Sequence, residues 1–127
     1  MKIMVVDDEK DVQSLFEQQF KRELKTREVE FVFAFSAEEA LAFLGNLGAS
    51  GIVLILSDIK MPGLSGLALL RTLKADYPGL KVFMITAYGD EKNYQTALEY
   101  GADEFITKPI DFDRLKSLIF KAGTPLP

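Results

Sequence analysis

The sequence contains no cysteine and no histidine among its 127 residues. Without cysteine the chain can form neither a disulfide framework nor a thiolate metal site. Without histidine, Ser-His triads and histidine-ligated metals are excluded as well. No apolar run approaches the ~20 residues that a membrane helix needs. Acidic residues also follow Val6 too early for a signal peptide. We therefore expect a cytoplasmic protein without membrane insertion.

Positive charge is outnumbered by negative charge. The chain has 15 lysines and arginines against 19 acidic residues, a net charge of −4, and we find no basic block. Direct binding of nucleic acid is therefore not expected. The length and the 48% of hydrophobic residues suit one domain with one core. We expect this domain to cover residues 1–122. Residues 123–127 read as a C-terminal tail or the start of a linker.

Strand-like and helix-like patterns alternate along the chain. Short β-branched, alternating or continuously apolar stretches predict five strands, near residues 2–6, 29–35, 51–57, 80–86 and 103–107. Apolar residues at helical spacing predict five helices, within residues 12–24, 36–44, 65–77, 90–98 and 111–119. Residues suited to helix N-caps precede the last four: Ser36 with Glu39, Ser65, Asp90 and Asp111. This alternation predicts a doubly wound α/β fold with parallel strands.

Polar side chains stand where four of the predicted strands end. Asp7 and Asp8 follow the first strand, Asp58 follows the third, Thr86 ends the fourth and Lys108 follows the fifth. In an open parallel sheet, ligand sites form outside the carboxyl ends of the strands. We therefore expect three carboxylates, one hydroxyl and one ammonium to share a small volume.

Carboxylates gathered in this way repel one another, at about 4 kcal/mol for each pair ~4 Å apart at an effective dielectric constant of ~20. Protonation of a carboxylate or a bound cation would relieve this repulsion. Since all the available ligands are oxygens, the site favours a hard divalent ion, most naturally Mg²⁺. Lys108 adds a fixed positive charge and Thr86 a hydrogen-bond donor. This combination suits phosphoryl transfer in which an aspartate oxygen attacks.

Four motifs carry a family resemblance: "VVDDE" at Val5–Glu9, "LSDIKMPGLSG" at Leu56–Gly66, "ITAY" at Ile85–Tyr88 and "GADEFITKPI" at Gly101–Ile110. With these motifs in this order at strand ends, the chain resembles the receiver domain of two-component response regulators from Lys2 to about Ala122. The resemblance implies a single flavodoxin-like domain, a five-stranded parallel sheet of order 2-1-3-4-5 with five helices.

The resemblance also implies roles for the residues at the strand ends. Asp58 resembles the phosphoacceptor, and Asp7, Asp8 and Asp58 resemble the carboxylates that hold Mg²⁺, or Mn²⁺ in its place. The backbone carbonyl of Lys60 resembles the third protein ligand of the metal besides the acidic pair. Lys108 resembles the lysine that pairs with the phosphoryl oxygens.

Further roles concern signalling and lifetime. Thr86 and Phe105 resemble the switch hydroxyl and the switch aromatic. Lys60 and Tyr88 occupy two variable positions that flank the site, where we expect them to set the lifetime of the phosphoryl group. The peptide bond between Lys108 and Pro109 is expected to be cis.

The implied function is a phosphorylation-activated switch in a two-component phosphorelay. A sensor histidine kinase or phosphotransfer protein would supply the phosphoryl group. An output domain or protein partner would read the surface of the fourth helix, fifth strand and fifth helix. Such a protein, a monomer or weak dimer, assists its own phosphorylation and dephosphorylation but does not turn over external substrates.

Two other functions stay open from the residues alone. One is a Mg²⁺-dependent phosphohydrolase with an aspartyl nucleophile. Against it, Lys60 stands two residues after Asp58, where a second acid/base carboxylate would be expected, and no cap insertion is present. The other is a flavin- or nucleotide-binding module of the same fold class. It would need a phosphate loop after the first strand, where "VVDDEKD" offers negative charge instead.

Overall fold

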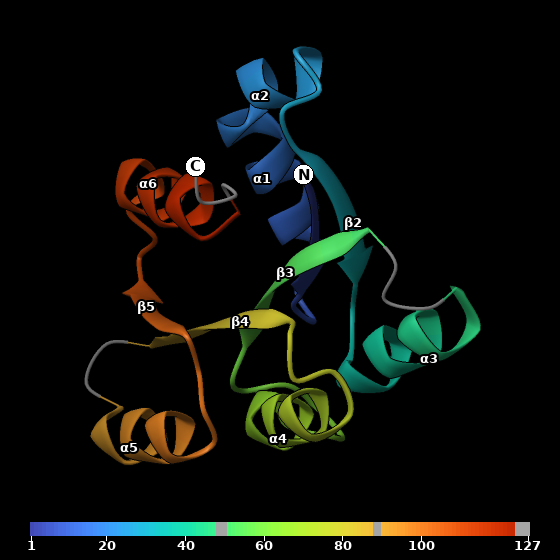
Figure 1. Cartoon of the computed structure of the whole chain (residues 1–127). Coiled ribbons are helices and arrows are strands. Elements are labelled where there is room, and N and C mark those ends of the chain that lie inside the picture. Colours follow the sequence, from blue (N-terminus) through green and yellow to red (C-terminus); the bar gives the residue numbers. More distant parts are fainter. Residues whose placement is uncertain (48–50, 88–89, 124–127) are drawn as a thin grey trace.

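In the computed structural model, the parts of the chain that are described are residues 1–47, 51–87 and 90–123, and they form five strands and six helices (Figure 1). The strands are β1 (Lys2–Val6), β2 (Glu30–Ala34), β3 (Ile52–Asp58), β4 (Lys81–Ala87) and β5 (Glu104–Lys108). The helices are α1 (Asp11–Gln19), α2 (Lys21–Lys25), α3 (Ala37–Leu47), α4 (Gly66–Asp76), α5 (Glu91–Glu99) and α6 (Phe112–Gly123). All five strands lie within one or two residues of their predicted positions.

The strands form one sheet of order β2-β1-β3-β4-β5, with every neighbouring pair parallel. The predicted flavodoxin-like order is therefore confirmed. Helices α1, α2 and α6 cover one face of the sheet, and α3, α4 and α5 cover the other (Figure 1). This doubly wound arrangement places all the carboxyl ends of the strands at one edge.

The core is divided by the sheet into two apolar layers. Along β1, Met4 and Val6 belong to the layer under α3, α4 and α5, whereas Ile3 and Val5 belong to the layer under α1 and α6. This alternation follows from the two-residue period of a strand. Because both faces are covered, β1 and β3 are almost continuously apolar, as the sequence indicates.

The prediction of five helices is wrong by one, because the segment at residues 12–24 forms two helices, α1 and α2. The break lies at Phe20, whose backbone angles of φ −107° and ψ 22° leave the helical region. The Phe20 ring is fully buried against Phe31 of β2, with ring centroids 5.0 Å apart, and Phe112 of α6. We attribute the break to this packing, which apolar spacing alone does not reveal.

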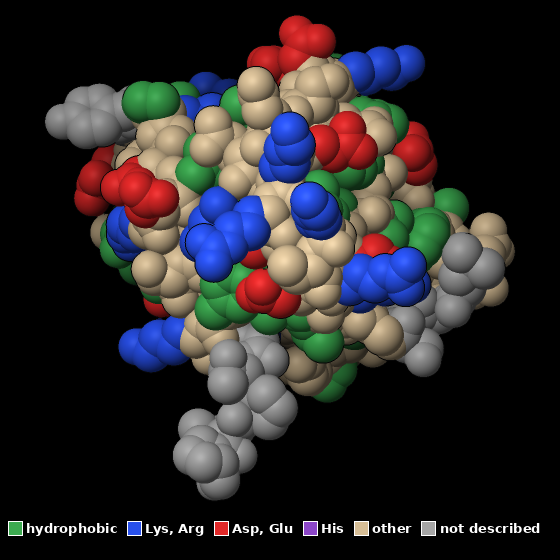
Figure 2. Space-filling model, turned by 90° about the horizontal axis from the view of Figure 1, so that it is seen from above, with side chains coloured by type: hydrophobic (Ala, Val, Ile, Leu, Met, Phe, Trp, Pro, Cys, Tyr) green, Lys and Arg blue, Asp and Glu red, His purple; other side chains and the backbone are tan. Residues whose placement is uncertain are grey.

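The surface over α1, α2 and α6 mixes charges of both signs (Figure 2). Lys116 of α6 pairs with Glu23 of α2 at 3.2 Å and lies 5.0 Å from the centre of the Phe20 ring. These contacts attach the short helix α2 to its neighbour. No helix among the described residues is both long and apolar enough to cross a membrane.

Two leucines on the predicted apolar helix faces lie in solvent instead. Leu15 of α1 is 40% exposed and Leu98 of α5 is 46% exposed. Their neighbours Phe16 and Ala97 are buried and fill the positions against the sheet. The buried faces of α1 and α5 are therefore narrower than the helical spacing of their apolar residues predicts.

Candidate functional site

Asp7 and Asp58 are held by backbone contacts at the carboxyl edge of the two central strands. Asp7 directly follows β1, and its N–H donates to the Ala34 carbonyl of β2 at 3.1 Å. Asp58 is the last residue of β3, paired in register with Ile85 of β4. After a register shift between Lys2 and Ile3, β1 pairs with β3 in regular register up to Val6 and Ser57, which brings the two strand ends side by side. The buried strands β1 and β3 thus fix the backbone positions from which both carboxylate side chains project.

The sequence-predicted cluster forms at this edge. Asp7, Asp8 and Asp58 each offer a carboxylate oxygen within 4.8 Å of the others. Lys108, at the end of β5, places its Nζ 3.2 Å from Asp58 Oδ2 and 3.7 Å from Asp7 Oδ2. Asp7 and Asp58 are buried, whereas Asp8 is exposed. These four residues are referred to below as the carboxyl-edge cluster.

Burial and charge shift the pKa values in the carboxyl-edge cluster. Burial raises the pKa of Asp7, and the negative charges of Asp58 and Asp8 act in the same direction. The Glu9 N–H, which donates to Asp7 Oδ1 at 2.9 Å, and the Lys108 ammonium oppose this rise. Partial burial lowers the pKa of Lys108, but the carboxylates around it, Asp58 above all, raise it overall. The single ammonium of Lys108 therefore pairs with both buried carboxylates, Asp58 and Asp7.

The loop after Asp58 is held close to the strand that precedes it. The Gly66 N–H donates to the Ile59 carbonyl at 2.8 Å, which folds the loop back at the start of α4. A Cβ on Gly66 would overlap the Asp58 carbonyl oxygen, so only glycine fits this close approach. Ser65 caps α4 as predicted, since its hydroxyl accepts the Ala68 N–H at 3.2 Å. Lys60 lies in this loop.

The side chain of Lys60 points across the rim of the site. Its ammonium lies 3.9 Å from Asp90 Oδ2, just before α5, and the side chain is 77% exposed. Asn93 also donates to this carboxylate, at 2.6 Å. Asp90 is the N-cap residue of α5, as predicted, but its carboxylate makes no capping hydrogen bond to the helix. Its position beside Lys60 and Asn93 accounts for the difference.

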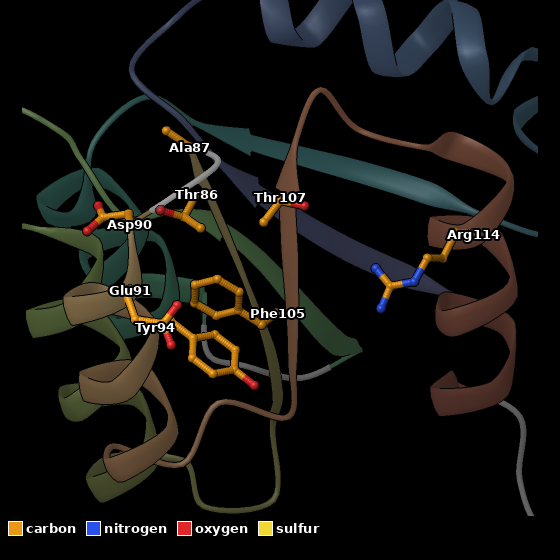
Figure 3. Close-up of a pocket in the computed structure, with 8 residues that line it drawn as sticks. All are labelled: Thr86, Ala87, Asp90, Glu91, Tyr94, Phe105, Thr107 and Arg114. Carbon is orange, nitrogen blue, oxygen red and sulfur yellow. The ribbon is translucent and has the colours of Figure 1, made fainter.

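Thr86 and Phe105 share a cavity of about 520 Å³ between α5, β5 and α6 (Figure 3). Thr86 stands on β4 one position beyond the register partner of Asp58, and it is almost fully buried. The Phe105 ring packs edge-on against Tyr94 of α5, with centroids 4.6 Å apart. The Lys108–Pro109 peptide bond is cis. Tyr88 lies outside the described residues.

The donor chemistry of the carboxyl-edge cluster fits a hard divalent cation. Every candidate ligand is an oxygen, which suits Mg²⁺ rather than softer metals. The carboxylates already lie close enough for one ion to contact them together. Burial, and after it the charges of Asp58 and Asp8, raise the pKa of Asp7, and a bound cation would offset both effects.

Fold and site together define a class: doubly wound α/β proteins with an acidic cluster and a lysine at the carboxyl edge of the sheet. The chain belongs to the response regulator receiver domain family, whose model matches residues 3–120. The chain is therefore the signal-receiving module of a two-component response regulator. This membership favours neither the phosphohydrolase nor the flavin-binding alternative.

Individual relatives agree with this assignment. The chain is 37% identical to the response regulator PilR of Pseudomonas aeruginosa over 122 residues, covering 95% of this chain and 26% of PilR. It is 35% identical to the DNA-binding transcriptional regulator NtrC of Proteus hauseri, over 96% of this chain and 24% of NtrC. The receiver domain of NtrX from Brucella abortus superimposes with a TM-score of 0.79 at 36% identity, covering 94% and 96% of the two chains. This chain thus spans about a quarter of the length of PilR and NtrC.

Proposed function

We propose that this domain accepts a phosphoryl group on Asp58 from the phosphohistidine of a sensor kinase or phosphotransfer protein. The observation that carries the proposal is the carboxyl-edge cluster: a buried aspartate at a strand end, two further carboxylates and one lysine within contact distance. The P–O bond to Asp58 forms as the P–N bond of the donor breaks, and the departing imidazole takes up a proton.

The residues of the carboxyl-edge cluster have different proposed roles in phosphoryl transfer. The carboxylates of Asp7, Asp8 and Asp58, with the backbone carbonyl of Lys60, are the ligands proposed for Mg²⁺, which neutralises charge on the transferring group when bound. The Lys108 ammonium, 3.2 Å from Asp58 Oδ2, is placed to follow the incoming phosphoryl oxygens. In this proposal the protein assists its own phosphorylation by the donor and the later hydrolysis of its phosphoryl group, but it does not turn over other substrates.

We propose that Thr86 and Phe105 transmit the phosphorylated state. The phosphoryl group adds about −1.5 to −2 charge, which attracts the hydroxyl donor of Thr86. The cavity shared by Thr86 and Phe105 provides room for the aromatic ring to follow. The surface of α5, β5 and α6 then changes, and an output domain or protein partner in the cytoplasm reads it.

The lifetime of the phosphoryl group is assigned to Lys60 and Tyr88. Hydrolysis needs a water in line with the bond to Asp58, and side chains at the rim hinder its approach. The alkyl stem of Lys60 crosses this rim toward Asp90. The ammonium, on a side chain that is 77% exposed, adds little charge stabilisation because solvent screens it.

Intact-mass measurement after treatment with acetyl phosphate and Mg²⁺ tests the proposal directly. The unaltered chain should gain one phosphoryl group, and Asp58→Asn should gain none. Omission of Mg²⁺ should suppress the gain in the unaltered chain. An equal gain in Asp58→Asn would show that Asp58 is not the acceptor, and a gain independent of Mg²⁺ would refute the metal assignment.

A further inference from the structure

The loop that follows Asp58 carries the proposed carbonyl ligand, and two backbone hydrogen bonds hold the residue before Lys60. The Ile59 N–H donates to the Ile85 carbonyl at 3.1 Å, and the Ile59 carbonyl accepts the Gly66 N–H at 2.8 Å. These bonds fix the two ends of the loop. They leave the course of the residues between Lys60 and Ser65 to other contacts.

One such contact comes from a different element. Glu38, in the first turn of α3 and 26 residues away in sequence from Leu64, accepts the Leu64 N–H on its Oε1 at 3.2 Å. Its other oxygen lies against Gly63, where an added Cβ would be only 2.8 Å from Oε2. Gly63 has φ +77°, a conformation that L side chains rarely adopt. Both carboxylate oxygens of Glu38 therefore meet the turn of the loop.

We infer that Glu38 is a positioning residue for the metal site, an inference that rests on the proposed function. Glu38 acts through the loop: its contact with Leu64 restricts the turn and so restricts where the Lys60 carbonyl lies relative to the carboxyl-edge cluster. A hydrogen bond from a backbone N–H to an ionised carboxylate is stronger than one to a neutral acceptor. Fixing the loop before metal arrives removes part of the ordering entropy from the binding step.

The neighbouring Glu39 provides a matched control. It lies in the same first turn of α3 and is also exposed; its own N–H bonds the Ser36 hydroxyl, and substituting its side chain leaves that bond in place. Glu39→Ala removes the same charge from the same helix turn as Glu38→Ala. A difference between the two variants therefore reports the contact with the loop rather than the long-range field of one carboxylate.

Two measurements on the full chain test the inference. In metal-free protein, hydrogen exchange at the Leu64 amide should accelerate in Glu38→Ala and stay unchanged in Glu39→Ala. In calorimetric titration with Mg²⁺ alone, the dissociation constant should rise about threefold to tenfold in Glu38→Ala, the effect of losing one modest hydrogen bond. Glu38→Gln, whose side-chain carbonyl can still accept the Leu64 N–H, should recover most of the affinity.

The outcomes separate this inference from the function on which it rests. Equal Mg²⁺ affinities in Glu38→Ala and Glu39→Ala would overturn the positioning role while leaving the metal site intact. Unaffected exchange at the Leu64 amide in Glu38→Ala would overturn the positioning role as well. Failure of the unaltered chain to bind Mg²⁺ would refute the proposed metal site and this inference together.

Discussion

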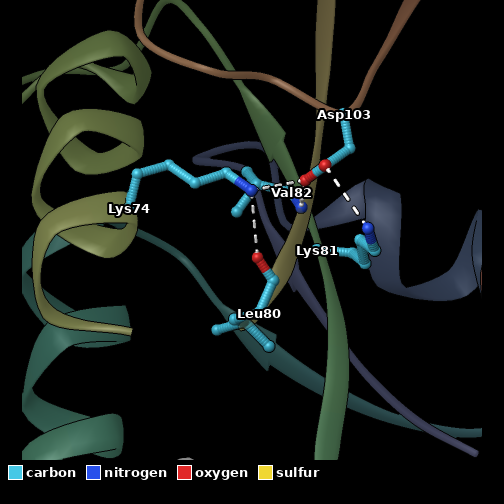
Figure 4. Close-up of polar contacts among 5 residues, drawn as sticks. All are labelled: Lys74, Leu80, Lys81, Val82 and Asp103. Atoms are coloured by element: carbon cyan, nitrogen blue, oxygen red, sulfur yellow. Dashed lines mark hydrogen bonds and ion pairs between the residues drawn. The ribbon is translucent and has the colours of Figure 1, made fainter. Parts of the chain in front are cut away.

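Two lysine–aspartate clusters lie at opposite edges of the same sheet, and they differ in how completely their charges are matched. At the amino edge, Asp103 Oδ2 accepts from the Val82 N–H at 2.8 Å and from Lys74 at 2.6 Å (Figure 4). Lys81 lies 3.8 Å from its other oxygen, and Lys74 also donates to the Leu80 carbonyl at 3.2 Å. Two cations thus serve one carboxylate.

At the carboxyl edge the ratio is reversed, since one ammonium, that of Lys108, pairs with both Asp7 and Asp58, and the Asp8 carboxylate lies beside these two. The two ion pairs of Lys108, at 3.2 and 3.7 Å, are longer than the 2.6 Å pair of Lys74 with Asp103. A cluster that only holds the fold together can satisfy its charges fully. The excess of negative charge at the carboxyl edge is instead what a site needs if it is to bind a cation and react with a phosphoryl donor.

Substitutions in the two clusters should have different effects, and the largest that we expect is the loss of stability in Asp103→Ala. The substitution removes the acceptor of the Val82 N–H and of Lys74, so the free energy of unfolding should fall by about 1.5–3 kcal/mol, as for hydrogen bonds to charged groups. Urea denaturation at neutral pH measures this. Mg²⁺ affinity should stay within about twofold of the unaltered value, below 0.5 kcal/mol. A stable variant with impaired Mg²⁺ binding would reverse the roles assigned to the two clusters.

The increase in the free energy of unfolding that Mg²⁺ causes should also distinguish the two clusters, by a smaller amount. At a concentration ten times its dissociation constant, the ion should raise the free energy of unfolding of the unaltered chain by about 1.4 kcal/mol. Asp58→Asn removes one of the proposed ligands, and if the Mg²⁺ affinity falls tenfold the gain at the same concentration drops to about 0.4 kcal/mol. Asp103→Ala should keep the full gain. Urea titrations with and without Mg²⁺ measure all three values, and an undiminished gain in Asp58→Asn would remove Asp58 from the ligand set.

The contrast also explains how much could be predicted from sequence. The strands are continuous or alternating apolar runs, and the polar residues at their ends must meet once the strands are parallel. Asp7, Asp58 and Lys108 could therefore be placed together before any coordinates. The strand order itself came only from the family resemblance, because periodicity carries no information about which strands are neighbours.

Contacts that depend on loop conformation or on exact packing could not be predicted in this way. The break at Phe20 follows from ring packing across three elements. Glu38 carries no sequence signal that links it to Leu64, because the two residues are 26 positions apart and the contact uses a backbone N–H, which any residue but proline offers. Gly66 reads as an ordinary turn residue until the Asp58 carbonyl is found where its Cβ would be. Such features depend on distances between helices, strands and loops, and the pattern of apolar and polar residues in the sequence does not determine these distances.

The smallest effect that we expect concerns pH and Asp7. Burial raises the pKa of Asp7 above its ordinary value of 3.8, and Asp58 adds to the rise against the Glu9 N–H and Lys108. Between a pH of 3.8 and the raised pKa, the Asp7 carboxyl group is protonated more often in the folded state than in the unfolded chain, so the free energy of unfolding falls as pH rises through that window.

Asp7→Asn removes this fall, and its side-chain oxygen can still accept the Glu9 N–H. In metal-free protein, the stability of Asp7→Asn relative to the unaltered chain should therefore increase with pH, whereas saturating Mg²⁺ should reverse the order because the ion binds the carboxylate better than the amide. Urea denaturation in chelator from pH 4 to 7 measures the difference. A difference that stays constant over this range would mean that folding does not raise the pKa of Asp7, and the contrast between the two edges would then rest on Asp58 and Lys108 alone.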